Sequence, residues 1–273
     1  MELPFPHIAE HKKYPATFLI NVEWRIHFSI ATSDTSYTNF FRFVKDKLDL
    51  ELKREDFNAM AILPLRYNQS EDAACIKISD KFAEFSFNAN GYTSFADSAR
   101  DIITSFLRLI YQCDGTVSHL MCNKKNLVTM QRNFECVEPE ILSVALSEQL
   151  LDSPAEILRP ADFTSDATPS THFYTLTADG MIMRVLYGAY ARLESTEYNG
   201  MTMREYGVML ESQCDVETKI DNAAECIRRV EYINDTMFDF INWALSPRIL
   251  RLMEIEIQDG IPEINITEIE DNE

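Results

Sequence analysis

The sequence has little glycine and none of the short motifs that mark common nucleotide-binding and catalytic sites. It contains seven glycines in 273 residues, and the patterns GxxxxGK(S/T), GxGxxG, GxSxG and HExxH do not occur. Phosphate-cradling loops need glycine because the backbone must approach the phosphate closely. Nucleotide-dependent chemistry is therefore disfavoured, and we predict no cofactor.

Long apolar runs and export signals are also missing. No window approaches the roughly 18 uninterrupted apolar residues of a membrane-spanning helix. The segment from Met1 to Tyr14 carries prolines, histidines and lysines where a secretory signal peptide has an apolar core. The six cysteines are scattered and form no CxxC pair, which favours reduced and mostly buried thiols. We expect a cytoplasmic protein that does not bind membranes.

Basic residues are scarce relative to acidic ones. The chain has 25 Lys and Arg against 44 Asp and Glu, which gives a formal net charge of −19. This charge repels phosphate backbones and anionic membrane surfaces, so direct nucleic-acid binding is not expected. It favours a basic protein partner, because opposite charges accelerate association and help to select the partner.

Part of this acidity lies in the C-terminal segment from Glu254 to Glu273, which contains eight acidic residues and no basic one. One interpretation is a solvated, disordered tail. The alternative is a strand that adds to a sheet edge of this or another subunit, because isoleucines alternate with polar residues at two places in the segment.

The residues that are present are sufficient for a large core, with 46% apolar residues, 17 Phe and 11 Tyr. The longest regular pattern runs from Asp221 to Met253, where apolar residues recur three and four positions apart, as on one face of a helix. Asp221 and Asn222 are good N-cap residues. Ser246-Pro247 predicts a break, after which Ser246 caps a short second helix that ends at Met253.

The rest of the chain predicts alternating strands and helices. Period-two alternation predicts a first strand from Thr17 to Ile30, and Asp34 or Ser36 can cap the helix that follows it. Further strands are expected at 59–65, 74–79, 82–88, within 116–128, and at 173–177, 181–192 and 206–214, with a helix that starts near Ser94 and another near Glu138.

Strands followed by a covering helix therefore occur twice, which predicts an α+β fold of two mostly antiparallel sheet units, each covered by a helix, with a long C-terminal helix. The predicted domains are an N-terminal α+β unit (1–135), a helical, proline-containing connector (136–165), a C-terminal α+β unit with the long helix (166–253) and the acidic tail (254–273).

Three parts of the chain resemble a bacterial protein family of sporadic distribution and unknown function. The hairpin around Ile76-Lys-Ile-Ser-Asp-Lys-Phe82 is followed by a Tyr92-Thr-Ser-Phe95 helix start and an apolar helix to Ile110. The segment from Met237 to Met253 is similar to the C-terminal signature of that family, in which a long helix passes through a capped break into a short final helix. Val22 to Phe28 resembles the opening strand.

The resemblance covers most of the length in the right order, but its motifs are structural and carry no functional residue. The family's Leu-Arg-Tyr-Ile-Asn strand is not kept, since the corresponding region reads Leu120-Met-Cys-Asn-Lys-Lys-Asn126. The patchy distribution of such a family is what mobile defence, toxin or immunity genes show. It therefore implies a role in immunity or antiviral defence.

Four residues form the nearest approach to a metal site: Cys113, His119, Cys122 and Cys136. Zinc needs four such ligands in a tetrahedral arrangement, and these spacings match no common zinc module. His119 and Cys122 lie three apart on a predicted strand, so their side chains should point to opposite faces. We interpret them as buried thiols and a histidine on a polar face, and we predict no metal.

The candidate catalytic residues lie close together near a predicted strand: Glu211, Asp215, Glu217 and Lys219. Carboxylates and a lysine in this pattern can hold Mg²⁺ and position a water for phosphodiester hydrolysis. The pattern is weak, because a carboxylate two residues before a lysine recurs by chance in an acidic chain, and the net charge opposes a DNA substrate.

The sequence thus favours a non-enzymatic cytoplasmic binding module, whose acidic surface engages a basic protein such as a toxin, a nuclease or a defence component. One alternative is a metal-dependent phosphodiester hydrolase. The other is a structural subunit of a homo-oligomer, joined through the long helix or through a C-terminal strand.

Overall fold

The computed structural model describes residues 3–14, 17–31, 33–48, 59–63, 74–79, 81–89, 92–160, 169–198 and 201–255. The strands are β1 (Leu19–Ser29), β2 (Ala59–Leu63), β3 (Ala74–Ile78), β4 (Phe82–Asn88), β5 (Thr116–Arg132), β6 (Glu156–Arg159), β7 (Thr171–Ala178), β8 (Met181–Tyr198) and β9 (Met201–Ile220). The helices are α1 (Asp34–Leu48), the π-helix η1 (Phe95–Ala99), α2 (Arg100–Gln112), α3 (Glu138–Ala145), α4 (Glu148–Leu151), α5 (Ala223–Ala244) and α6 (Pro247–Met253).

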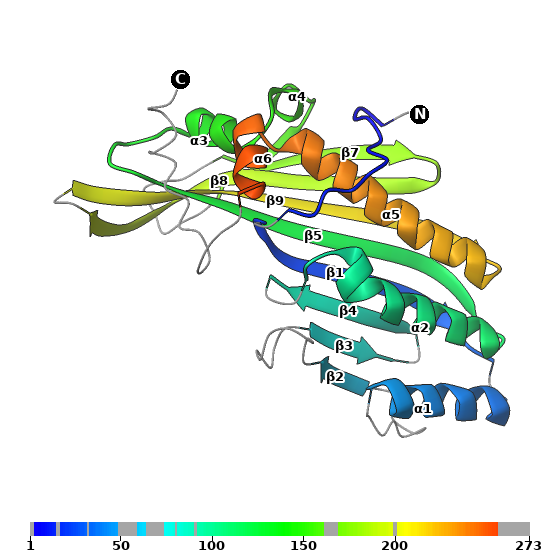
Figure 1. The fold of residues 1–273 in the computed structure, drawn as a ribbon. Helices are drawn as coiled ribbons and strands as arrows, with labels where there is room; N and C mark the ends of the chain where they lie inside the picture. Colours follow the sequence, from blue (N-terminus) through cyan, green and yellow to red (C-terminus); the bar gives the residue numbers. More distant parts are fainter. Residues whose placement is uncertain are drawn as a thin grey trace.

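All nine strands belong to one antiparallel sheet, in the order β2-β3-β4-β1-β5-β9-β8-β7-β6 (Figure 1). The prediction of two separate sheet units is therefore wrong. β5 and β9 pair along their length, from Val117 opposite Ile220 to Arg132 opposite Arg204, and join the two halves of the chain. The mixed helix-and-strand class, the antiparallel sheet and the C-terminal helix are confirmed. The domain boundaries stay predictions, and residues 256–273 of the predicted tail lie outside the described residues.

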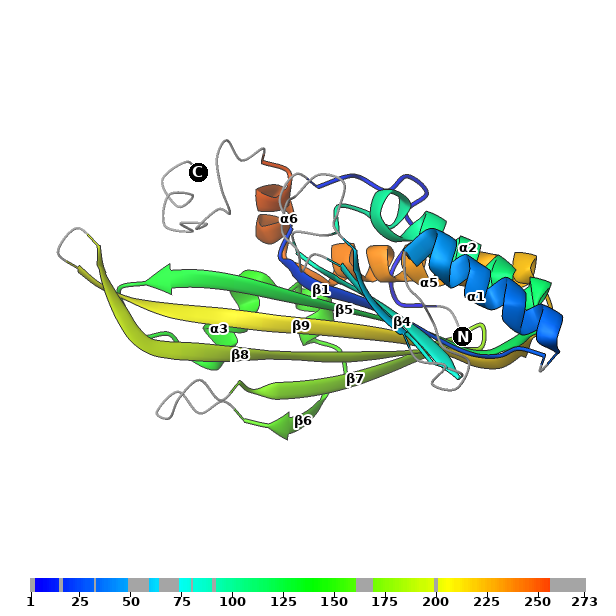
Figure 2. The same ribbon diagram turned by 90° about the horizontal axis from the view of Figure 1, so that it is seen from below.

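The two faces of the sheet differ because side chains alternate along each strand. Helices α1, α2 and α5 lie over one face, which we call the covered face (Figures 1 and 2). Along β1, Val22, Trp24, Ile26 and Phe28 are buried under these helices, as the period-two pattern predicts. The residues between them point to the opposite face, on which no described helix packs.

Phe106 of α2 is the centre of an aromatic cluster on the covered face. Its ring lies 5.4 Å from Phe28 of β1, 5.5 Å from Phe85 of β4 and 6.0 Å from Phe40 of α1, measured between ring centroids. The rings meet edge to face, the arrangement that aromatic quadrupoles favour, and all four side chains are almost fully buried. This cluster ties α1 and α2 to the N-terminal half of the sheet.

The C-terminal helices begin and end where the capping residues predict. Asn222 accepts a hydrogen bond from the Glu225 backbone N–H (2.9 Å) and starts α5, and Ser246 accepts one from Ile249 (3.3 Å) and starts α6. The break between them also pairs with the end of α3, since Ser246 donates its backbone N–H to Ala145 (3.0 Å). None of the described helices has the length and apolarity needed to cross a membrane.

The turn between β7 and β8 shows why this hairpin could be recognised in the sequence. Asp179 and Gly180 both have positive φ values, 50° and 75°. Two such residues in succession form the turn whose twist matches that of the flanking antiparallel strands, and Asp-Gly is a preferred pair for it.

We expect the Phe106→Ala substitution to lower the free energy of unfolding by roughly 3–5 kcal/mol, because it removes the ring at the centre of the aromatic cluster and leaves a cavity. Urea denaturation monitored by circular dichroism measures the change. Phe134→Ala is the matched control, since Phe134 is 56% exposed, and its effect should stay within about 0.5 kcal/mol. Equal losses for the two variants would contradict this account of the core.

Candidate functional site

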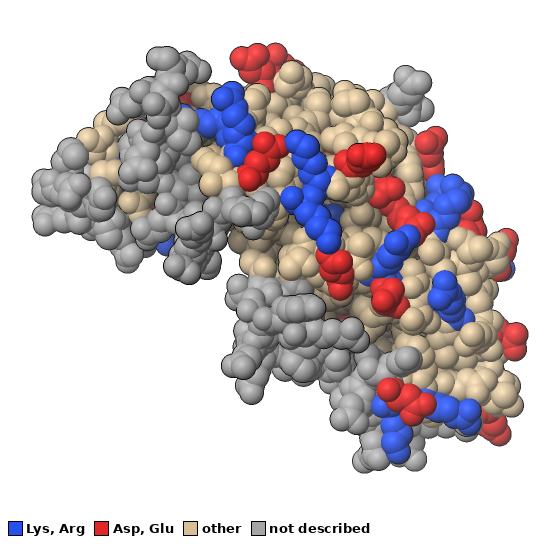
Figure 3. Space-filling view, in the orientation of Figure 1, with Lys and Arg blue, Asp and Glu red and all other residues tan. Residues whose placement is uncertain are grey.

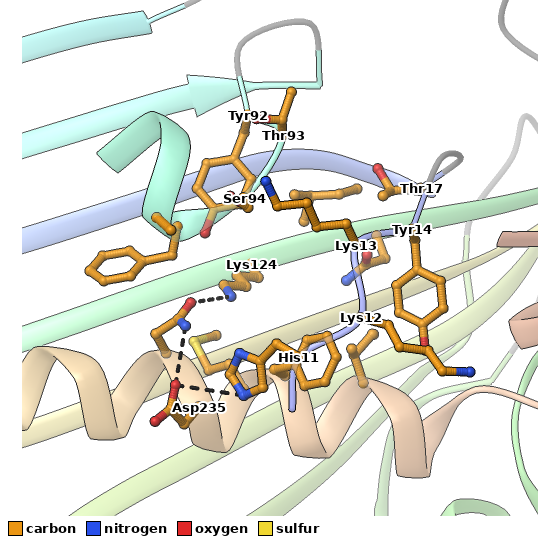
Figure 4. A pocket seen from close by; sticks show the side chains of 18 of the residues that line it. His11, Lys12, Lys13, Tyr14, Thr17, Tyr92, Thr93, Ser94, Lys124 and Asp235 are labelled. Atoms are coloured by element: carbon orange, nitrogen blue, oxygen red, sulfur yellow. Dashed lines mark hydrogen bonds and ion pairs between the residues drawn. The ribbon is translucent and has the colours of Figure 1, made fainter. Parts of the chain in front are cut away.

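A cavity of ligand size lies between the covered face, helix α5 and the N-terminal segment (Figure 4). Its volume is about 470 Å³, within the range of roughly 300–1,000 Å³ that is usual for small-molecule sites. Its lining comes from the N-terminal segment, the start of β1, the turn into η1, the middle of β5 and β9, and α5. Residues that are far apart in the chain therefore converge on it.

The N-terminal residues 3–14, which we call the strap, cross over α5 and close one side of this cavity (Figure 1, dark blue). The ring of Phe5 packs against Phe240 (5.9 Å between centroids) and Trp243 (5.8 Å). Asp239 binds the strap twice, at 2.9 Å from Nδ1 of His7 and at 2.9 Å from the backbone N–H of Ile8. Hydrogen bonding to Asp239 and its negative charge raise the pKa of His7.

The second half of the strap forms part of the cavity wall. The His11 ring stacks on Phe238 at 4.0 Å, and its Nε2 lies 3.6 Å from Asp235. Tyr14 donates its hydroxyl hydrogen to Asn242 of α5. In Figure 4 these side chains lie on one side of the cavity, and Tyr92 lies on the other. The strap is thus held to α5 along its length, and only the contacts of its second half adjoin the cavity.

The floor of the cavity is formed by polar residues on the covered face of the sheet. Lys124 of β5 lies between Val22 of β1 and Ser212 of β9 in the strand register. Asn126, two residues further along β5, therefore points to the same face and is 6% exposed. Apolar residues occupy most other positions of this face, so three polar side chains in the middle of it interrupt the core.

A series of polar contacts connects Lys124 to α5. Its ammonium donates a hydrogen bond to Oδ1 of Asn234 (3.1 Å), and Nδ2 of Asn234 lies 3.4 Å from Oδ1 of Asp235. Asp235 is also the carboxylate that faces His11 of the strap. Burial lowers the pKa of Lys124, while the thiols of Cys122 and Cys214 and the charge of Asp235 act in the opposite direction. The direct partner of the ammonium is thus a neutral amide.

The other lysines and arginines that line the cavity each face a carboxylate. The pairs are Lys12 with Glu254 (2.7 Å), Lys13 with Asp97 (2.7 Å) and Arg100 with Glu231. Figure 3 shows blue and red side chains next to one another across the face that carries the strap. Lys124 differs from these neighbours because it is partly buried in the cavity floor and has no carboxylate in direct contact among the described residues.

The hydroxyl of Tyr92 is an enclosed polar group without a partner among the described residues. The residue as a whole is 8% exposed. Burial raises the pKa of Tyr92 well above its usual value, so the hydroxyl keeps its hydrogen at physiological pH. The ammonium of Lys124 lies 5.9 Å from the centroid of the Tyr92 ring, a cation–π distance.

The position of Tyr92 follows from the helix start that the sequence predicts. Ser94 is the N-cap of η1, accepts a hydrogen bond from the Asp97 backbone N–H (3.1 Å) and donates its own hydrogen to the Asp97 carboxylate (2.8 Å). The helix start predicted near Ser94 is thus confirmed. Because Tyr92 lies two residues before this fixed point, its ring is directed toward the sheet and the cavity (Figure 4).

A second cavity, of about 940 Å³, lies next to the strap and the start of α5. Its charged groups already have partners in the protein, since His7 contacts Asp239, Arg228 contacts Glu225 (2.7 Å), and Glu231 contacts Arg100. It contains no unpaired buried group comparable to Lys124 or Tyr92 among the described residues. We therefore take the first cavity as the candidate site.

The four residues considered as metal ligands are not brought together. Cys113 follows α2 and donates its thiol hydrogen to the Ser36 carbonyl (3.3 Å), and Cys136 lies in the loop before α3. Cys122 is fully buried on the covered face, whereas His119 lies on the opposite face, as predicted from their spacing. Within the described ranges, no group of three or more His, Cys, Asp and Glu is arranged to hold a metal ion.

The four residues considered as catalytic lie at alternate positions of β9, so they share the face opposite the cavity. Glu211 accepts a hydrogen bond from Asn123 (2.7 Å) and lies 3.4 Å from the ammonium of Lys125. Glu217 and Lys219 are exposed. Glu211 therefore contacts two residues of the neighbouring strand β5, Asn123 and Lys125.

Asp215 is the most buried of these candidates, at 3% exposure. Its carboxylate contacts Arg184 of β8, Nε2 of His119 (3.0 Å) and Nε2 of Gln213 (2.7 Å). His119 in turn stacks on His27 of β1 at 5.0 Å. These contacts form a cross-strand network that connects β1, β5, β9 and β8, and the proposed role in hydrolysis stays a prediction.

The residues that line the cavity floor were not identified from the sequence. Lys124 and Asn126 lie in the Leu120–Asn126 segment, which stands out in the sequence only because it departs from the family pattern. The available signal was the sequence of β5 itself, in which a lysine and an asparagine continue the apolar set of Leu120 and Cys122 at period two. Tyr92 was noted as part of a helix start and not as a site residue.

Comparisons with known proteins add no assignment to this site. A scan against protein-family models finds no match, and a search of curated proteins finds no matching sequence. The resemblance to a sporadically distributed bacterial family therefore stays a prediction, and every role discussed for a residue rests on the geometry of this chain.

The buried ammonium of Lys124 should make stability depend on pH. Its pKa in the folded protein is lower than the ordinary value of 10.5, so the unfolded chain binds the proton more tightly. The charged lysine then costs stability at neutral pH, and this cost disappears as the pH rises toward 10.5. We expect the free energy of unfolding of the wild type, relative to Lys124→Met, to increase between pH 7.5 and pH 10 in urea denaturation.

Lys125→Met is the matched control for this measurement, because Lys125 is the next residue of β5, points to the opposite face and is 37% exposed. Its stability difference from the wild type should not show the same rise. A difference between wild type and Lys124→Met that stays constant over this pH range would show that the ammonium is not buried.

Proposed function

We propose that this protein binds a small molecule in the cavity beneath the strap. The observation that carries the proposal is the Lys124 ammonium, which lies in the floor of a 470 Å³ cavity and whose direct hydrogen-bond partner is the neutral Asn234. A partly buried charge whose direct partner is a neutral amide is costly, and it is seldom kept in a core unless it interacts with something. A bound ligand is the interaction that the geometry supports best.

Three further features support a binding site at this position. The cavity combines apolar surface with convergent polar groups, as ligand sites do. The polar groups stand on β5 and β9, at the centre of the sheet, where neighbouring strands hold them in fixed positions. The strap is bound to α5 by side-chain contacts, so it can separate from α5 without breaking the sheet.

A neutral fluorescent probe tests whether the cavity takes a ligand. We expect N-phenyl-1-naphthylamine, whose emission rises in apolar surroundings, to bind saturably with one site per chain. Ala96→Trp should weaken this binding by about fivefold or more, because Ala96 lines the cavity and is exposed enough to accept a larger side chain without disturbing the core.

Ala224→Trp serves as the control for that variant, since Ala224 is an exposed alanine in the first turn of α5 and does not line the cavity. The two variants should differ in dye affinity and agree in thermal stability. Absence of saturable binding to the wild type, or equal affinity in both variants, would contradict a ligand site in this cavity.

Association with a basic protein in the cytoplasm is a second proposal, which is supported by the net charge of −19. It predicts an association rate that falls steeply as the salt concentration rises, because screening weakens the attraction between opposite charges. A pull-down from the native host at low salt would supply the partner, and surface plasmon resonance would give the rate. An association rate that is equal at low and high salt would exclude an electrostatic mechanism.

A further inference from the structure

We infer that the ligand is a monocarboxylic acid with an apolar body, which binds with its carboxylate at Lys124 and its body against α5 and η1. The inference rests on the proposed function of the cavity and adds the chemical class of the ligand. It follows from the hydrogen-bonding capacity of the floor, from the contacts of the charged groups, and from the composition of the walls.

The floor of the cavity offers hydrogen-bond donors. A lysine ammonium has three donor hydrogens and no acceptor, and Asn234 takes one of them. The Tyr92 ring lies 5.9 Å from this ammonium, and its hydroxyl is enclosed by protein. A ligand group that meets the Lys124 ammonium must therefore accept hydrogen bonds, which favours an oxygen-bearing anion over an amine or an alkyl group.

The charge balance of the site favours a ligand with a single negative charge. Lys12, Lys13 and Arg100 each contact a carboxylate directly, whereas Lys124 contacts the neutral Asn234, and the Asp235 carboxylate lies beyond that amide. The carboxylates of Glu231 and Asp235 also line the cavity and would repel a second negative charge on the ligand. One carboxylate at Lys124 would form a buried, charge-assisted pair, with hydrogen bonds that exceed a neutral pair in strength.

The walls above this floor are suited to an apolar body. Phe95 of η1 and Met237, Phe238 and Ile241 of α5 line the cavity together with Leu19 of β1. Figure 4 shows Lys124 deep in the cavity, with the strap and the Tyr92 loop on either side of the space above it. A ligand with its acid group at Lys124 would therefore place its other end along these walls and beneath the strap.

The test compares three ligands that share one alkyl chain and differ in the head group: octanoate, octanol and octylamine. Isothermal titration calorimetry at pH 7.5 measures their affinities for wild type, Lys124→Met and Lys125→Met. For the wild type we expect octanoate to bind about tenfold or more tightly than octanol, since hydrogen bonds to charged groups contribute roughly 1.5–3 kcal/mol. Octylamine should bind most weakly.

The variants assign this preference to a residue. Lys124→Met should lose the preference for octanoate and retain the affinity for octanol, because the apolar walls are unchanged. Lys125→Met should bind all three compounds as the wild type does, since its side chain lies on the opposite face next to Glu211.

The other outcomes show whether only the ligand class is wrong or the proposed function as well. If octanol binds as tightly as octanoate, or if Lys124→Met and Lys125→Met lose octanoate equally, the carboxylate assignment is wrong and the cavity remains a ligand site. If octyl phosphate binds more tightly than octanoate in a Lys124-dependent manner, the head group is a phosphate. If neither the neutral dye nor any octyl compound binds, both proposals fail.

Discussion

The architecture depends on the pairing of β5 with β9, because this pair joins the two halves of the chain into one sheet. It also places α2, which precedes β5, beside α5, which follows β9, on the covered face of the sheet. Tyr111 of α2 donates to the carbonyl of Ile220 at the end of β9 (2.8 Å), and Arg100 of α2 contacts Glu231 of α5. The candidate cavity lies where these two helices, the strap and the paired strands meet, so it exists only when both halves have folded together.

The cavity conflicts with the packing rule that shapes the rest of the covered face. Around Phe106, large apolar side chains fill the space between sheet and helices, whereas Lys124, Asn126 and Ser212 interrupt this core on the neighbouring strands β5 and β9. A charge in such surroundings lowers stability, and a ligand that binds only the folded state would restore it in proportion to its affinity and concentration. Stability and binding are thus opposed at Lys124, as is common at functional sites.

Local features of the fold could be predicted from the sequence because short-range interactions determine them. The break between α5 and α6, the cap at Ser94 and the turn at Asp179-Gly180 each depend on residues within four positions of one another. The single sheet could not be predicted in this way. The partner of β5 lies about 90 residues further along the chain, and alternation along a strand shows which residues share a face but not which strand lies beside it.

The candidate site was missed for a related reason. In β5, Lys124 and Asn126 continue the set of Leu120 and Cys122, so a period-two reading assigns two polar residues to an apolar face. If these two polar residues are taken as chance exceptions, they weaken the prediction of a strand. In the structure the strand continues to Arg132 and the conflict marks the cavity floor. Residues that only stabilise the fold are expected to be apolar where the alternation makes them buried. A polar residue at such a position inside a long, well-paired strand is therefore a candidate for function.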